Sequence, residues 1–77
     1  MTKEIKKLLG NNIRVVRKKR KLSVKEVAEK SGLARVTLAN IESGLDAISI
    51  NNLYRISKAL DIDILKILPS SDFFFED

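Results

Sequence analysis

The sequence contains no cysteine, no histidine and no tryptophan, and only one proline. The absence of cysteine excludes disulfides, thiolate chemistry and cysteine-ligated zinc. The absence of histidine removes the commonest general base and metal ligand. The carboxylates are scattered and form no acid–base or metal-binding pattern. We therefore expect no enzyme, and no cofactor, metal or small-molecule ligand.

Long apolar runs are also absent. No stretch approaches the roughly 20 apolar residues that a membrane-spanning helix needs, and the first ten residues have too little apolar length for a secretory signal. We expect a soluble, cytoplasmic protein with no membrane partner. A chain of 77 residues allows one hydrophobic core, which we expect within residues 1–69, followed by a tail at residues 70–77.

Basic residues concentrate in the first half of the chain. Residues 1–35 carry twelve Lys and Arg against three Glu, a net charge of +9, and residues 36–77 carry three Lys and Arg against seven acids, a net charge of −4. The densest run is Arg17–Lys21. A helix C-terminus favours basic residues, but five in succession exceed what one helix end needs. A basic half suits a polyanionic partner.

The middle of the chain predicts two short helices joined by a turn. Ser23 and Glu26 have the spacing of a capping box, which marks the start of the first helix. Gly32 falls where a left-handed residue ends that helix at little steric cost. The second helix is expected over residues 35–43. This is the pattern of a helix-turn-helix at about residues 23–43, and the second helix of such a unit can enter the major groove of DNA.

Hydrophobic periodicity predicts three further helices and no strand, so we expect an all-α, five-helix domain. Apolar residues recur at helical spacing in two places: at Ile5, Leu9, Ile13 and Val16, and at Ile50, Leu53, Ile56 and Leu60. A last short helix is expected after Asp63, carrying Ile64, Leu65 and Leu68. Pro69 would end it.

Several segments together resemble the Cro/repressor (Xre-like) helix-turn-helix family of phage and bacterial regulators. The resemblance covers about residues 9–68 and depends on the order and spacing of the segments. They are Leu9–Arg17, Leu22–Ala28, Ser31–Leu33, Ile41–Gly44, Ile48–Leu53 and Ser57–Leu60. The small restriction–modification controller proteins of this family are similar in length and in two of the stretches, Gly32–Arg35 and Ser49–Leu60.

The resemblance implies a compact lambda-repressor-like domain that binds double-stranded DNA sequence-specifically and regulates transcription. It also implies a homodimer on a near-palindromic operator, with helix 35–43 in the major groove. The alternative is a protein-interaction module, such as an antitoxin-like partner, in which DNA binding is secondary. The acidic second half of the chain leaves room for that alternative.

Base contacts are expected from the exposed face of the recognition helix. Arg35 can donate two hydrogen bonds to guanine, and Asn40 can form a bidentate pair with adenine. Val36 offers an apolar contact, suited to a thymine methyl group, and Thr37 lies beside these residues. The residues expected to face bases are Arg35, Val36, Thr37 and Asn40.

Phosphate contacts are expected around this helix. The candidates are Asn12, Arg14, Arg17, Lys25, Ser43 and Gly44, the last two through backbone N–H groups, which often bind phosphate. In the resembling family an Arg of the first helix pairs with a Glu near the end of the recognition helix. Here these residues would be Arg17 and Glu42, a structural pair in which Arg17 could also face a phosphate.

Aromatic residues are few, and three of the four lie near the C-terminus. A disordered tail usually avoids such a cluster, so the tail is expected either to pack on the core or a second subunit, or to be a frayed end. The residues expected at a dimer interface are Leu65, Leu68, Phe73, Phe74 and Phe75.

Overall fold

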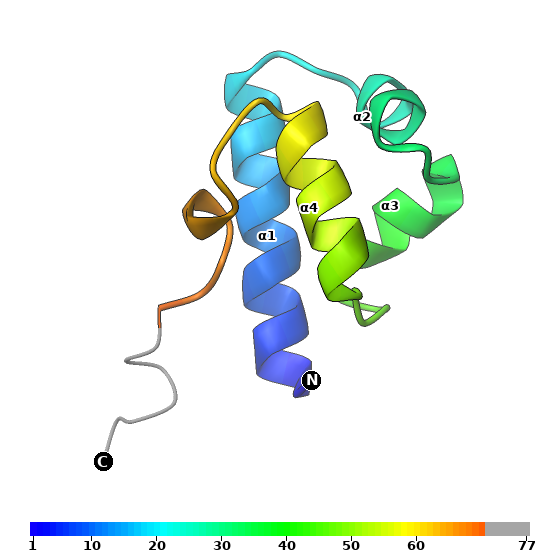
Figure 1. Ribbon diagram of the computed structural model, residues 1–77. Coiled ribbons are helices and arrows are strands. Elements are labelled where there is room, and N and C mark those ends of the chain that lie inside the picture. The colour runs from blue at the N-terminus through cyan, green and yellow to red at the C-terminus, as the bar shows by residue number, and fades with distance from the viewer. Residues whose placement is uncertain (71–77) are drawn as a thin grey trace.

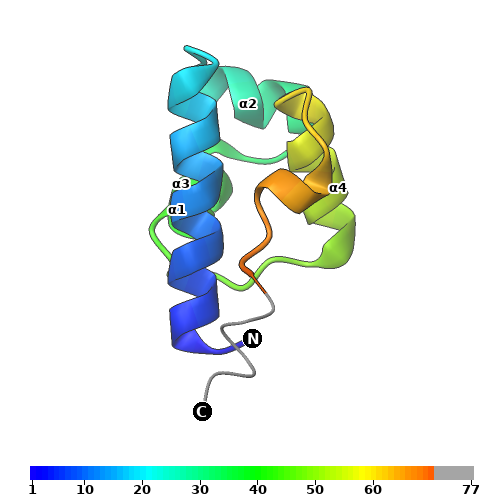
Figure 2. The ribbon, with the colours of Figure 1, turned by 90° about the vertical axis from the view of Figure 1, so that its left-hand side faces the viewer.

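The computed structural model describes residues 1–70. Four α-helices and one short 3₁₀ helix make up this part of the chain: α1 (Lys3–Lys19), α2 (Val24–Ser31), α3 (Arg35–Glu42), α4 (Ile50–Ala59) and η1 (Ile64–Lys66). Helix α1 packs against α3, and α2 packs against both α3 and α4 (Figure 1). Helix η1 lies between α1 and α4 on the near side of Figure 2, with α3 behind, so η1 and α3 occupy opposite sides of the molecule.

The prediction of a fifth α-helix is wrong in type, because the segment forms a single 3₁₀ turn. The carboxylate of Asp63 accepts a hydrogen bond from the Leu65 N–H (3.0 Å), and the Lys66 N–H donates to the Asp63 carbonyl (2.9 Å). Both bonds reach back only two or three residues. Pro69 follows too soon for the i to i−4 bonds of an α-helix to become established.

Local signals explain where the four α-helices begin. The Ser23 hydroxyl accepts from the Glu26 N–H (3.0 Å), and the Glu26 carboxylate accepts from the Ser23 N–H (2.9 Å), so the predicted capping box is present. The N–H of Ser23 holds the pKa of the Glu26 carboxyl below its ordinary value of 4.5. Thr2 and Ser49 cap α1 and α4 through their side chains. Residue 34 is alanine, so α3 begins without a side-chain cap.

The core gathers apolar side chains from the four α-helices and from the segments that follow α3, α4 and η1. It consists of Leu9, Ile13, Val27, Ala28, Leu38, Ile41, Ile48, Leu53, Ile56, Leu60 and Ile67. Ile67 is fully buried and fixes η1 against the bundle. None of the helices in the described part of the chain combines the length and hydrophobicity needed to span a bilayer.

Gly10 determines how closely α1 and α3 approach. A Cβ atom at this position would collide with the carbonyl oxygen of Ile41 and would lie 2.7 Å from that of Glu42. An interior glycine usually weakens a helix, but here it allows the C-terminal end of α3 to rest directly on the α1 backbone.

Candidate nucleic-acid interface

The turn between α2 and α3 sets the orientation of the second helix. Gly32 adopts φ +73, a left-handed conformation that glycine accepts without strain. The Leu33 N–H then donates to the Ala28 carbonyl (3.0 Å), and the half-buried Leu33 side chain packs against the core. The chain therefore turns sharply and enters α3 in a fixed direction, as a helix-turn-helix requires.

Helix α3 is buried on one side only. Leu38 and Ile41 face the core, whereas Arg35, Val36 and Ala39 are exposed, and Thr37 and Asn40 are half-buried. Val36 is 66% exposed, so a β-branched apolar side chain is left in water beside a cationic one.

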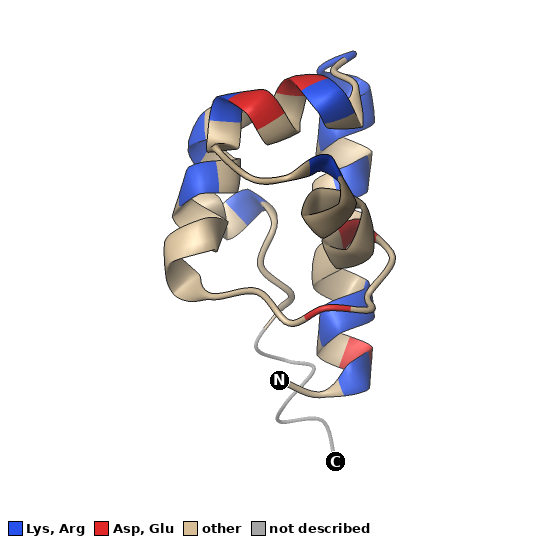
Figure 3. Ribbon diagram, turned by 90° about the vertical axis from the view of Figure 1, so that its right-hand side faces the viewer, with Lys and Arg blue, Asp and Glu red and all other residues tan. Residues whose placement is uncertain are grey.

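The polar side chains of this face are free to meet a ligand. No ion pair or hydrogen bond within residues 1–70 engages the Arg35 guanidinium or the Asn40 side-chain amide. Asn40 is bonded only through its backbone, whose carbonyl accepts from the Leu45 N–H (2.9 Å). The four residues expected to contact bases thus lie on the part of α3 that the core leaves uncovered. In Figure 3, α3 is on the side of the molecule that faces the viewer.

A buried ion pair locks α3 to α1. The Arg17 Nε and a terminal guanidinium nitrogen donate to the two carboxylate oxygens of Glu42 (2.7 and 2.9 Å), and the two side chains are 10% and 5% exposed. The hydrogen bond to Glu42 raises the pKa of Arg17. The remaining terminal nitrogen donates to the Leu22 carbonyl (2.9 Å). Each of the three nitrogens makes a hydrogen bond inside the protein, which confirms the expected structural pair of Arg17 with Glu42. Two of the five guanidinium N–H groups have no hydrogen-bond partner within the described residues, so the phosphate contact of Arg17 stays a prediction.

Asn12 has a structural role that the sequence did not predict. Its side-chain amide donates to the carbonyl of Ile67 (2.9 Å), the residue that directly follows η1. The partners are 55 residues apart in sequence, which is why the local pattern did not reveal this bond. The expected phosphate contact of Asn12 stays a prediction.

The backbone N–H groups of Ser43 and Gly44, which were expected to bind phosphate, are hydrogen-bonded inside the protein. Their backbone N–H groups donate to the carbonyls of Ala39 (3.0 Å) and Ile41 (3.1 Å). Gly44 is buried, with a backbone φ of +76, and lies against Lys7. These N–H groups are therefore unavailable to phosphate, and only the hydroxyl of the exposed Ser43 remains. Arg14 and Lys25 are exposed, as a phosphate contact requires.

The expected dimer residues fall into three groups. Leu65 is 72% exposed on η1, Leu68 is half-buried against the core, and Phe73–Phe75 lie outside the described residues. The periodicity grouped Ile50 with Leu53, Ile56 and Leu60, but Ile50 is 64% exposed. Tyr54, four residues further along α4, is 58% exposed, and this spacing was the signal for a second apolar surface.

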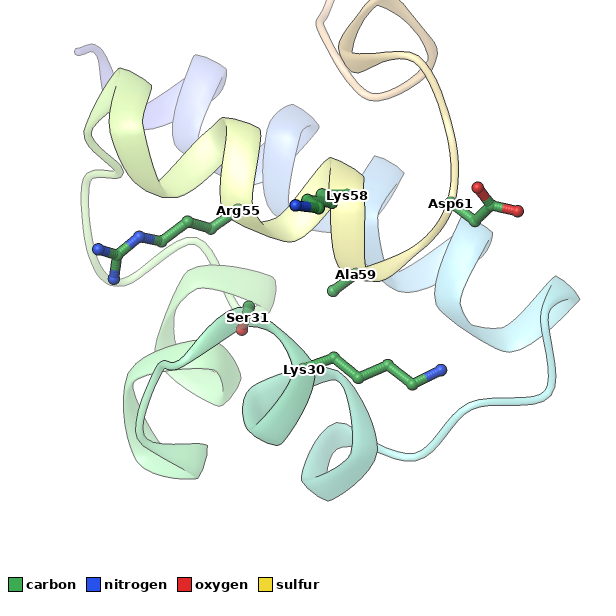
Figure 4. A pocket seen from close by; sticks show the side chains of 6 residues that line it. All are labelled: Lys30, Ser31, Arg55, Lys58, Ala59 and Asp61. Carbon is green, nitrogen blue, oxygen red and sulfur yellow. The ribbon is translucent and has the colours of Figure 1, made fainter.

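A cleft between α2 and α4 is lined by several basic side chains, but these do not form an anion-binding site. Its volume is about 560 Å³, and its lining includes Lys30, Arg55, Lys58 and Asp61. Figure 4 shows the Lys30 and Arg55 side chains pointing in opposite directions along the cleft, so the cationic groups do not converge on one ligand position. Lys30 and Lys58 lie in the last turns of their helices, where they complement the helix dipoles.

Comparison with known proteins matches this chain to a helix-turn-helix family model and to regulatory proteins. The helix-turn-helix family model HTH_3 matches residues 13–67. The transcriptional regulator SinR of Bacillus licheniformis is 35% identical over 66 residues, which are 84% of this chain and 60% of SinR. The control protein C.BamHI of Bacillus amyloliquefaciens is 35% identical over 63 residues, covering 80% of this chain and 78% of the relative.

Solved structures share the fold. The restriction–modification controller protein C.AhdI of Aeromonas hydrophila superimposes with a TM-score of 0.80 and 28% identity, covering 82% of this chain and 96% of that one. The DNA-binding domain of BldD superimposes with a TM-score of 0.81 and 28% identity, covering 90% of this chain and all of that domain.

Proposed function

The chain belongs to the helix-turn-helix family of DNA-binding transcriptional regulators, which are not enzymes, and we propose that it binds a near-palindromic operator as a homodimer with α3 in the major groove. Double-stranded DNA is its ligand, and a cytoplasmic location is part of the proposal. The observation that carries it is the surface of α3, where Arg35, Val36 and Asn40 are presented on a helix whose opposite side is locked into the core.

The dimensions of α3 suit this role. An α-helix with its side chains is about 10–12 Å across, and the major groove is about 12 Å wide. In the proposed complex Arg35 donates to guanine, Asn40 pairs with adenine and Val36 contacts a thymine methyl group. Thr37, half-buried beside them, completes the reading surface.

Phosphate contacts in the proposed complex come from residues whose polar atoms stay free. Arg14, Lys25 and the Ser43 hydroxyl meet this condition, because all three residues are exposed. They lie on α1, on α2 and directly after α3, so the contacts would come from three elements around the reading surface. Phosphate contacts fix the position and orientation of a protein on the duplex, but they do not distinguish one base sequence from another.

The homodimer would form through the apolar surface of α4 and η1. Ile50, Tyr54 and Leu65 are large apolar residues left exposed there, and Tyr54 lines a groove of about 710 Å³ together with Ile62 and Ile64. A two-fold axis through this region would set two copies of α3 about 34 Å apart, one turn of DNA.

Selection of bound duplexes from a random pool tests this function. We expect recovery of a symmetric motif with half-sites one helical turn apart. An Arg55→Ala variant, which removes an exposed cation from α4, should recover the same motif. Recovery of all sequences in equal proportion would contradict the proposal and leave only a nonspecific basic protein.

A further inference from the structure

Helix α1 carries a stripe of basic residues that the core and the ion pairs leave unused. Lys3, Lys7, Arg14 and Lys18 are spaced by four, seven and four residues, which places them on one face of a helix, and all four are exposed. We call these four residues the basic stripe. Within residues 1–70 the ion pairs are Arg17–Glu42 and Arg20–Asp61, and neither involves the stripe.

The helix dipole does not explain the basic stripe. Lys18 lies in the last turn of α1, where a cation is favourable, but Lys3 is the first residue of the helix and Lys7 lies in its N-terminal half. Cations near a helix N-terminus oppose the macrodipole. Lys3 therefore opposes the dipole, partly balanced by Glu4 in the same turn, and Lys7 lies beyond the first turn, where the dipole gives no reason for a cation.

The basic stripe runs along the edge of the reading surface. The end of α3 rests on α1 at Gly10, and Gly44, just beyond α3, packs so closely on Lys7 that a Cβ atom there would lie 2.8 Å from the Lys7 Cγ. Figure 3 shows basic segments recurring along α1 beside α3. The basic stripe extends along α1 on both sides of the contact between Gly44 and Lys7, to Lys3 at one end and to Lys18 at the other.

We propose that the basic stripe binds the sugar-phosphate backbone beside the groove that α3 occupies. This inference rests on the proposed function and adds three lysines, Lys3, Lys7 and Lys18, to the expected contact at Arg14. The fifteen residue steps from Lys3 to Lys18 span about 22 Å of helix. This length is several times the roughly 3.4 Å rise per nucleotide of a DNA strand, so the stripe is long enough to meet more than one phosphate. The contact is independent of sequence.

Two variants with equal charge loss test the basic stripe. The stripe variant combines Lys3→Gln, Lys7→Gln, Arg14→Gln and Lys18→Gln. The control variant combines Lys30→Gln, Arg55→Gln, Lys58→Gln and Lys66→Gln, which lie on α2, α4 and η1. Because Lys58 lines the groove of the proposed dimer surface, sedimentation velocity first establishes that the control and wild-type chains have the same oligomeric state. Each variant lowers the formal net charge of +5 by four. The probe is a random-sequence 30-base-pair duplex, and affinity is measured by fluorescence anisotropy against salt concentration.

Each lost phosphate contact lowers the slope of log K against log salt by about 0.9. We expect the slope to fall by about three to four units in the stripe variant and by less than one unit in the control. Equal falls in the two variants, or no fall in the stripe variant, would overturn the inference. If the stripe variant fails to fold, judged by circular dichroism, Lys3→Gln with Lys18→Gln replaces it, with an expected fall of about two units.

The same measurement separates this inference from the proposed function. The wild-type chain is also titrated with a duplex recovered from the random pool. If it binds that duplex no better than the random one, sequence-specific reading fails, whereas the slope comparison still decides the role of the stripe. If discrimination is present and the slopes of the two variants agree, only the basic stripe is refuted. We expect discrimination to persist in the stripe variant.

Discussion

At the residue scale, two arginines of this chain show how burial separates structure from recognition. Arg17 is buried and gives all its guanidinium nitrogens to Glu42 and to Leu22, whereas Arg35 is exposed and has no partner within the described residues. A guanidinium is strongly hydrated unless it is paired. The first arginine therefore contributes to folding, and the second is available to DNA.

Arg35→Ala should weaken binding to the selected operator by about 1–3 kcal/mol and relax the preference at one base pair per half-site. The measurement is the affinity for a set of operators that each carry one substituted base pair. An equal loss on every operator would show that Arg35 binds phosphate and does not read a base. Lys30→Ala, at an exposed position of α2, serves as the control and should leave both affinity and preference unchanged.

Glu42→Ala should lower the free energy of unfolding by about 3–5 kcal/mol, because it leaves the buried Arg17 charge without a partner. Operator affinity should fall with it, since α3 loses its anchor to α1. Urea unfolding measures the first effect. Arg20→Gln removes an exposed pair with Asp61, whose charged atoms are 3.9 Å apart, and should cost less than about 1 kcal/mol. Similar losses in the two variants would contradict the structural role of the buried pair.

Glu26 should make stability depend on pH in the acid range. Its pKa is lowered in the folded state by the N–H of Ser23, so folding is favoured by its ionised form. The contribution is complete above the ordinary pKa of 4.5 and is lost as pH falls through the lower, folded-state pKa. The melting temperatures of the wild-type chain and a Glu26→Gln variant should therefore differ near neutral pH and converge in acid. A difference independent of pH would refute this assignment.

At the element scale, the helices that form from local signals were predictable, and the features that depend on distant partners were not. The capping box at Ser23 and the periodicity of Leu9 and Ile13 lie within a few turns of chain, so α1 to α4 follow from sequence. The bond from Asn12 to Ile67 joins segments that no local pattern connects. The internal bonding of the Ser43 and Gly44 N–H groups depends on how the end of α3 is wound.

Gly10 is an intermediate case, because the sequence marks it as unusual but does not give its reason. An interior glycine lowers helix propensity by about 1 kcal/mol relative to alanine. Its compensation is the contact with the end of α3, which only the tertiary structure reveals. The same contact places the predicted reading surface of α3 relative to α1, so the residues of that surface could be predicted but their support could not.

Gly10→Ala should destabilise the fold by about 1–3 kcal/mol despite the better helix propensity of alanine, because the added methyl group overpacks the α1–α3 contact. Asn11→Ala, at the neighbouring exposed position, should be neutral or slightly stabilising. Thermal unfolding of the two variants makes the comparison. A Gly10→Ala variant as stable as Asn11→Ala would show that α3 shifts without cost.

At the scale of the whole molecule, the proposed reading surface and the proposed dimer surface belong to different elements of the described residues. The reading surface of α3 lies opposite η1 (Figure 2), while exposed apolar residues remain on α4 and η1. A thin core in a short chain gains stability from association. Reading a two-fold operator also requires two copies.

Tyr54→Asp combined with Leu65→Asp should convert a dimer into a folded monomer. Each new carboxylate would lose its hydration in an apolar interface without gaining an ion pair or a hydrogen bond. Sedimentation velocity gives the oligomeric state. Val15→Asp, which alters an exposed apolar residue of α1, should leave the dimer intact. A wild-type chain that sediments as a monomer at every concentration, with and without operator, would contradict the homodimer.

A solved structure of the chain bound to its selected operator would show directly whether α3 lies in the major groove. We predict the Arg35 guanidinium and the Asn40 amide within about 3.2 Å of base-edge atoms in the major groove. A complex in which this surface of α3 faces solvent or another part of the protein, while a different element contacts the bases, would contradict the account.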